Sequence, residues 1–335
     1  MVAVIGYTLL GPVSAHCDDW TADLKPQARL LLAALIMAEG NPVPRWRLAQ
    51  VLWDDQDDPP GGLKRVAAEL RGRLREVLPE TDPVPGSAEA YRLDLRPDQA
   101  DVLRFRAQVK AAWGAGPGPG PAALLRSALR EWGDQADSLF GGEPLAGLYG
   151  GWAESIRAGL RAEYRDARLA CLRQDLLDHH DERVAGECRR LAAEPASRRE
   201  ELLIEYWMIA TYRAGRRVEA EGIYQSALVS LRDVGLEPSS RLSRLAEVIR
   251  TEDPVLDGPG NVGQWTGTTA SPASTGRPMN GKNVTVNFFN NASVNGPQVG
   301  EVENLIVHAS GEVAMDAPQT GEEKGEEDGE GEQTA

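Results

Sequence analysis

The sequence predicts a mainly α-helical protein: a mixed α+β module comes first, then a nearly all-helical domain, then a long tail. Two breaks in composition divide the 335 residues in this way. The first is the Gly/Pro run AGPGPGP at residues 115–121, a composition that excludes regular helix and central strand. The second follows Arg250, where Gly, Pro, Ser and Thr replace aliphatic residues. We therefore expect domains at residues 1–114 and 115–250 and a flexible linker at 251–282.

Charge is distributed unevenly along the chain. The formal net charge is −15, of which −11 belongs to residues 251–335, with 3 basic and 14 acidic side chains. The acidic balance therefore does not argue against anion binding by the folded part. No run of 18 apolar residues predicts a membrane span. Three cysteines are too few for a disulfide framework, so we expect a cytoplasmic location.

The first module has the element order of a winged helix-turn-helix. A β-type run at Val2–Leu10 comes first. Apolar periodicity then predicts helices at Leu24–Glu39, Trp46–Trp53 and Pro59–Leu78. The alternating segment Glu89–Asp94 predicts a strand of a terminal hairpin, which would be the wing.

The third of these helices carries the sharpest pattern. One face gathers its apolar side chains, which are Leu63, Val66, Leu70, Leu74 and Val77. On another face Lys64, Arg71 and Arg75 lie within about 40° of one another, with Ala68 between them. A small residue flanked by cations suits close approach to a phosphate-lined groove. The alternative interpretation is a solvated charged face, which most surface helices have.

The second domain is predicted to be helical almost throughout. The expected helices are 121–132, 152–178, 181–194, 198–214, 217–234 and 239–250, with C-cap glycines at Gly215 and Gly235. Tetratricopeptide spacing is matched by small and aromatic residues at Tyr212, Gly215, Glu219–Ala220, Tyr224 and Ala227. Residues 167–195 look like a degenerate preceding repeat. Such pairs stack into a concave surface that binds a protein or an intramolecular partner; the alternative is a helical bundle with chance matches.

Catalytic and metal-binding patterns do not stand out. The sequence has no GxxxxGK[ST] phosphate loop. His179-His180-Asp181 lies near Cys171 and Cys188 in sequence, but the spacing matches no zinc pattern. We therefore expect a protein that is not an enzyme and uses no metal or cofactor.

Several short segments together resemble one known family, the Streptomyces antibiotic regulatory protein (SARP) family. In the first module Leu10–Pro12, Lys25–Ile36, Arg47–Pro60 and Tyr91–Leu95 are similar to its OmpR-like winged helix, and Asp101–Phe105 opens the linker. In the second domain Glu143–Ala146, Trp152–Glu154, Tyr212–Arg216 and Gly235–Pro238 fit its bacterial transcriptional activator domain (BTAD). The resemblance covers residues 1–250.

The resemblance implies a transcription activator that reads direct-repeat promoter DNA as a homodimer and recruits RNA polymerase through its helical domain. It also implies association with the nucleoid. The recognition helix would fall on residues 61–78, where LRGRLR (Leu70–Arg75) departs from the Val-Ser-x-Leu-Arg-like run of the family. Only the helix and its basic residues are therefore carried over, together with one arginine beside the wing. The candidate DNA-binding residues are Lys64, Arg65, Arg71, Arg73, Arg75 and Arg92.

Residues 283–309 form a β-prone segment that this family does not explain, and residues 310–335 read as an acidic disordered tail. The segment is rich in Asn, Val and Gly, a composition that suits β-stacking between chains. Gln298, Val299 and Gly300 are similar to the core of RHIM-like and bacterial amyloid signalling motifs. The alternatives are a hairpin docked on the helical domain, or plain linker.

These observations leave two functional hypotheses. The first is the DNA-binding regulator. The second is a non-enzymatic adaptor that acts through the helical domain and through a partner carrying a matching amyloid-like motif.

Overall fold

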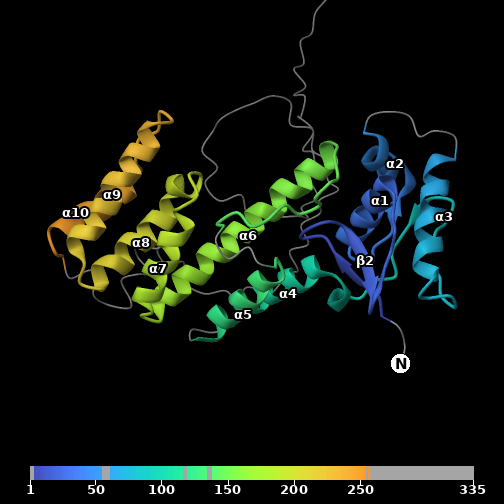
Figure 1. Ribbon diagram of the computed structural model, residues 1–335, viewed down its shortest axis with the longest axis horizontal. Coiled ribbons are helices and arrows are strands. Elements are labelled where there is room, and N and C mark those ends of the chain that lie inside the picture. The colour runs from blue at the N-terminus through green and yellow to red at the C-terminus, as the bar shows by residue number, and fades with distance from the viewer. Residues whose placement is uncertain (1–3, 55–60, 116–118, 134–137, 254–255, 257–335) are drawn as a thin grey trace, which may run out of the picture. The chain divides into compact units, whose positions relative to one another are not determined.

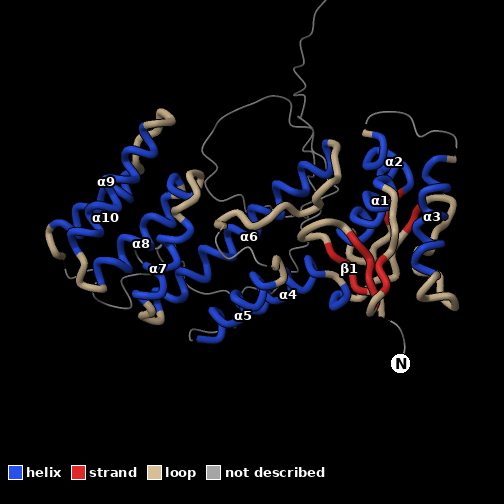
Figure 2. Tube along the Cα trace, viewed as in Figure 1, coloured by secondary structure: helices blue, strands red, loops and turns tan. Residues whose placement is uncertain are grey.

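The computed structural model describes residues 4–54, 61–115, 119–133, 138–253 and 256. These residues belong to one compact unit, Met1–Thr275, and the second unit, Gly276–Ala335, lies outside the described residues. The predictions for residues 257–335, including Gln298, Val299 and Gly300, therefore concern residues that the structure does not describe. The mainly helical fold with a small amount of strand, shown in Figure 1 and Figure 2, confirms the predicted fold class. Within the described residues, no helix combines the length and apolarity that a membrane crossing requires.

A three-stranded antiparallel sheet begins the chain. β1 (Gly6–Thr8) pairs with β2 (Ser14–Cys17), which in turn pairs with β3 (Trp20–Thr21). The sequence predicts only one strand here, so β2 and β3 are additions that the structure reveals. Both strands are too short to show an alternating pattern, and a fully buried Ala15 is the main apolar residue of β2.

Three helices follow in the predicted order, within a few residues of the predicted bounds. They are α1 (Pro26–Met37), α2 (Arg45–Trp53) and α3 (Gly62–Arg75). α1 has Pro26 in its first turn, where a missing N–H costs no intrahelical bond, and its aliphatic side chains are almost completely buried. α1 packs against both α2 and α3, as Figure 1 shows. α3 thus lies against the core of the module along one face only.

The predicted wing hairpin is present, but its strand is shorter than expected and has a second partner. Arg92 N–H donates to the Pro85 carbonyl and Asp94 N–H donates to the Pro83 carbonyl, which closes the hairpin. β5 (Ala90–Tyr91) also pairs with β4 (Val43–Pro44), a strand immediately before α2. The start of α2 is therefore attached to the wing, a long-range pairing that no local pattern predicts.

A helix that was not predicted from the sequence lies at the end of residues 1–114, where Asp101–Phe105 was assigned as the start of the linker. α4 (Asp101–Gly114) follows a short 3₁₀ turn, η1 (Pro97–Gln99), and packs against α5 (Pro119–Arg130). The exclusion of helix from residues 115–121 was thus wrong for its last three residues. Pro119 and Pro121 occupy the first turn of α5, where the backbone N–H groups have no intrahelical acceptor in any helix.

The remaining helices match the predicted set closely. They are α6 (Gly151–Leu177), α7 (Asp181–Leu191), α8 (Glu201–Arg213), α9 (Arg217–Arg232) and α10 (Ser240–Arg250), with η2 (Ser197–Arg199) before α8. Gly215 and Gly235 both have φ of +76°, so both predicted C-cap positions are confirmed. α8 packs between α7 and α9. The small residues Ala220 and Ala227 of α9 are buried.

Candidate nucleic-acid interface

α3 presents a small-residue face to solvent. Lys64, Arg65, Ala68, Gly72 and Arg75 are all exposed, and their spacing of three or four residues places them on one side of the helix. A Cβ added to Gly72 would meet no other atom within 4 Å. The centre of this face therefore carries only the small residues Ala68 and Gly72, with basic side chains around it. We call these two positions the low centre of the face. The opposite side carries the predicted apolar residues, of which all are buried except Val77, which is half-buried.

Two of the predicted DNA-binding residues hold the wing hairpin against α3. Arg71 donates from Nε to Asp82 Oδ1 at 2.8 Å and from Nη2 to the Val84 carbonyl at 2.6 Å. Arg75 donates from Nε to the Thr81 carbonyl at 3.2 Å and lies 3.5 Å from Asp82 Oδ1. Asp82 thus neutralises part of the charge on these guanidinium groups. The side chain of Arg75 remains 46% exposed, whereas that of Arg71 is 23% exposed.

Arg73 belongs to a different side of the helix. Its Nη1 donates to Glu76 Oε1 at 3.0 Å, and the Trp20 indole N–H donates to the other oxygen of Glu76 at 3.2 Å. Hydrogen bonds from Arg73 and Trp20 lower the pKa of Glu76. Arg73 is therefore paired with Glu76, next to Trp20 of β3, and does not lie beside the low centre of the face.

Lys64, Arg65 and Arg92 form no ion pair with any residue that the structure describes, and all three are exposed. Lys64 and Arg65 lie in the first turn of α3, and Arg92 directly follows β5 in the wing. Their charges therefore remain available to a polyanion on this side of the module.

A basic and aromatic cluster that was not predicted from the sequence lies at the start of α2. Trp46 is 60% exposed, and the Arg47 guanidinium lies 5.1 Å from the centroid of its ring. Arg45 lies 5.9 Å from the centroid of the Tyr91 ring and donates to the Ala88 carbonyl of the wing loop. The RWR triplet was the available signal, but its position beside the wing depends on the β4–β5 pairing.

The first module is joined to the helical domain by backbone contacts. Asp101, at the start of α4, is 5% exposed, and its carboxylate accepts N–H bonds of 2.9 to 3.0 Å from Leu9 and Leu10. Leu145 N–H donates to the Leu9 carbonyl, and Ala146 N–H donates to the Gly11 carbonyl. The segments Leu10–Pro12 and Glu143–Ala146 therefore meet, although the resemblance gave no reason to pair them.

A buried arginine holds the loop that contacts Leu9 and Gly11. Arg157 on α6 is 6% exposed and donates to the carbonyls of Pro144, Leu145 and Leu148. Glu154 lies 2.5 Å from the same guanidinium, one turn earlier in α6. These bonds fix the loop that contacts Leu9 and Gly11.

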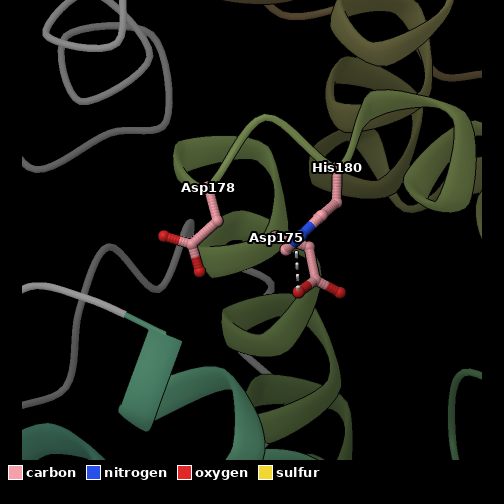
Figure 3. Close-up of side chains that lie close together, drawn as sticks. All are labelled: Asp175, Asp178 and His180. Atoms are coloured by element: carbon pink, nitrogen blue, oxygen red, sulfur yellow. Dashed lines mark ion pairs between the residues drawn. The ribbon is translucent and has the colours of Figure 1, made fainter.

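One cluster at the end of α6 has the composition of a metal site. Potential ligand atoms of Asp175, Asp178 and His180 lie within 4.8 Å of one another. Figure 3 shows the three side chains and the ion pair between His180 and Asp175. The same Asp175 oxygen, however, pairs with Arg126 and with Arg183, and Arg183 also bonds His180 Nδ1 at 2.7 Å. Two guanidinium groups thus supply the positive charge that a cation would bring, and the cluster joins α5, α6 and α7.

Comparison with known proteins gives matches in both parts of the chain. Residues 100–250 match the family model described as the bacterial transcriptional activator domain. The chain is 32% identical over 314 residues to "Regulatory protein AfsR" of Streptomyces coelicolor, a match that covers 92% of this chain. It is 27% identical to "Regulatory protein DnrI" of Streptomyces peucetius, a match that covers 74% of this chain and 93% of that protein.

The chain belongs to the SARP family.

A solved structure supports the fold of this SARP chain. "Mycobacterium tuberculosis EmbR in complex with low affinity phosphopeptide" superposes with a TM-score of 0.68 at 24% identity, over 79% of this chain and 69% of that one. This SARP chain spans only 29% of the length of the S. coelicolor protein and 25% of a second AfsR from Streptomyces griseus. The matched domain begins at residue 100, so it includes α4, which precedes the boundary predicted at 114/115.

Proposed function

We propose that this protein is a DNA-binding transcriptional activator that reads promoter DNA with α3 and the wing. The observation that carries the proposal is the exposed face of α3, where Ala68 and Gly72 form a low centre beside Lys64 and Arg65. A helix with small central residues approaches the floor of the major groove closely, while flanking cations reach the phosphates. The names of the family model and of the relatives support a role in regulating transcription.

The wing and the start of α2 are proposed to hold the DNA backbone on either side of α3. Arg92, Arg47 and the exposed Trp46 supply cations and an aromatic face there. Arg71 and Arg75 act first as positioning residues, because their bonds to the 81–84 segment keep the wing beside the helix. No residue is proposed to perform catalysis.

The helical domain is proposed to support a homodimer on direct-repeat DNA and to contact RNA polymerase. A single winged helix buries little DNA surface, so tandem use of two modules raises both affinity and specificity. The joint at Asp101 and Arg157 would transmit the position of one domain to the other.

A salt titration of binding tests the DNA interface. The full chain is titrated onto the DNA upstream of its own gene, with scrambled DNA as competitor. Replacing Lys64→Ala and Arg65→Ala together is expected to reduce the slope of log affinity against log salt by about 2, because each lost phosphate contact removes about one released ion. Lys110→Ala is the control, since Lys110 is also an exposed cation and lies on α4.

The result also separates this proposal from the adaptor hypothesis. The proposal is supported if the native protein binds the native fragment more tightly than scrambled DNA and the Lys64/Arg65 variant loses this preference. Binding that ignores sequence, or that the variant leaves unchanged, rejects it and favours an adaptor acting through the helical domain.

A further inference from the structure

One carboxylate, that of Asp82, pairs with two cations near the C-terminal end of α3. Its Oδ1 accepts a hydrogen bond from Arg71 Nε at 2.8 Å and lies 3.5 Å from Arg75 Nη2. The side chains of Asp82 and Arg75 are 42% and 46% exposed, so this second pair is in contact with solvent. An acidic group therefore stands beside the helix face that we propose to approach DNA.

The two arginines differ in how firmly they are held. Arg71 donates to Asp82 and, at 2.6 Å, to the Val84 carbonyl, and only 23% of its side chain is exposed. Arg75 has longer contacts, which are the 3.5 Å approach to Asp82 and a 3.2 Å bond to the Thr81 carbonyl. An exposed ion pair contributes little stability, because water screens it and both side chains lose freedom. Arg75 can therefore exchange Asp82 for another anion at small cost, whereas Arg71 stays fixed against the wing.

Arg75 is well placed to meet a DNA phosphate. It follows Gly72 by three residues and Ala68 by seven, so it lies on the same side of α3 as the low centre. Lys64 lies at the other end of this side, about 16 Å away along the helix axis. A phosphate contact by Arg75 would therefore extend the interface over the whole length of the helix. Asp82 neutralises that guanidinium, and its own charge repels a phosphate that approaches the same place.

We propose that Asp82 limits the affinity of this protein for DNA by neutralising Arg75, the last cation of the α3 face. The inference rests on the proposed DNA-binding function and names a residue that tunes it. Phosphate contacts carry no sequence information, so Asp82 lowers binding to native and scrambled DNA by the same factor. Base contacts then account for a larger share of the affinity that remains.

Asp82→Asn in the full chain tests the proposal. Asparagine keeps an oxygen that accepts from Arg71, and the Arg71 bond to the Val84 carbonyl does not involve Asp82, so the wing stays in place. At about 0.1 M salt we expect the affinity for both DNAs to rise about fivefold, and the slope of log affinity against log salt to steepen by about 1, because one more phosphate contact forms.

Glu182→Gln is the matched control for the change in net charge. Glu182 is also an exposed carboxylate paired with an arginine, Arg216, but it lies on α7 of the helical domain. Its replacement removes the same charge and should leave the affinity for DNA and the salt slope nearly unchanged.

A double-mutant cycle connects the gain to Arg75. In the native background, Arg75→Ala is expected to change the affinity by less than about twofold, because Asp82 already neutralises this side chain. In the Asp82→Asn background, the same substitution should remove the fivefold gain. An affinity that Asp82→Asn leaves unchanged or lowers, a gain matched by Glu182→Gln, or a gain that persists after Arg75→Ala would each overturn the proposal.

These results can be told apart from a failure of the DNA interface itself. If α3 does not bind DNA, the Lys64/Arg65 variant and the Asp82→Asn variant both keep the salt slope of the native protein. If α3 binds DNA but Asp82 does not limit the affinity, the Lys64/Arg65 variant lowers the slope and Asp82→Asn leaves it unchanged.

Discussion

The carboxylate of Asp101 accepts the backbone N–H groups of Leu9 and Leu10, residues more than ninety positions earlier in the chain. The bonds connect the first turn of α4 to the end of β1 and are completely buried. The same carboxylate also accepts the N–H of Val102, so one side chain satisfies three backbone donors. Burial raises the pKa of Asp101, while these hydrogen bonds oppose the increase.

Asp101→Asn is therefore expected to lower the free energy of unfolding by about 2–4 kcal/mol, because the amide NH₂ faces buried N–H donors and leaves at least one unsatisfied. Urea denaturation measures the difference. Asp98→Asn, three residues earlier and exposed, is the control and should change the stability far less than Asp101→Asn does. If Asp101→Asn changes the free energy of unfolding as little as Asp98→Asn does, the hydrogen bonds between Asp101 and Leu9 and Leu10 contribute no stability.

Arg71 and Arg65 lie on the same helix and are expected to differ in what they do. Arg71→Ala removes the donors to Asp82 and the Val84 carbonyl and should lower the free energy of unfolding by about 1–2 kcal/mol. Arg65→Ala removes no bond that the structure records among its described residues, and should leave stability within about 0.5 kcal/mol. Thermal or urea unfolding of the two variants compares them directly; a more stable Arg71→Ala protein would contradict the positioning role.

Two substitutions at Gly72 should affect stability and DNA binding differently. Gly72→Ala is expected to raise the free energy of unfolding by about 0.5–1 kcal/mol, since the position is open and alanine restricts the unfolded chain. Gly72→Glu places a carboxylate at the low centre of the α3 face and should abolish binding to the promoter fragment. Gly222→Glu, at an equally open position on α9, is the matched control and should bind DNA normally. Normal DNA binding by Gly72→Glu would remove this face from the interface.

The buried carboxyl of Glu205 should make the stability of the protein depend on pH. Burial raises its pKa to about 7 from 4.5, and the attraction of Arg241 at 2.7 Å only partly opposes this. The folded state therefore holds a proton that the unfolded state releases near pH 4.5, and the corresponding stability is lost as the pH rises through about 7. Glu205→Gln removes this titration, so its stability relative to the native protein should increase between pH 5 and pH 8.

The size of this effect is on the order of 1–3 kcal/mol, since one pKa unit corresponds to about 1.4 kcal/mol. Unfolding by urea at several pH values measures it, with the exposed Glu182→Gln as control. A difference between Glu205→Gln and the native protein that stays constant with pH would mean that Glu205 is ionised throughout this range.

Most helix positions were predictable because most of the helices carry an apolar face and some end at a local signal, although α1 is buried on nearly all sides and α4 was not predicted. Gly215 and Gly235 stop their helices by adopting positive φ, a preference of the residue itself. The proline-rich start of α5 was misread, because the sequence shows the prolines but not where the first turn begins. β2 and β3 were missed because short strands are defined by their partners.

The sequence by itself determined most of the helical faces, including the position of Ala68 among the cations of α3, since these follow from residue spacing within one element. The tertiary structure decided what the cations near that face do. Arg71 and Arg75 bond the 81–84 segment only because the wing folds back onto α3, and Arg45 reaches the wing only through the β4–β5 pairing. Partners that lie far apart in sequence are chosen by packing, and no local pattern of residues contains that information.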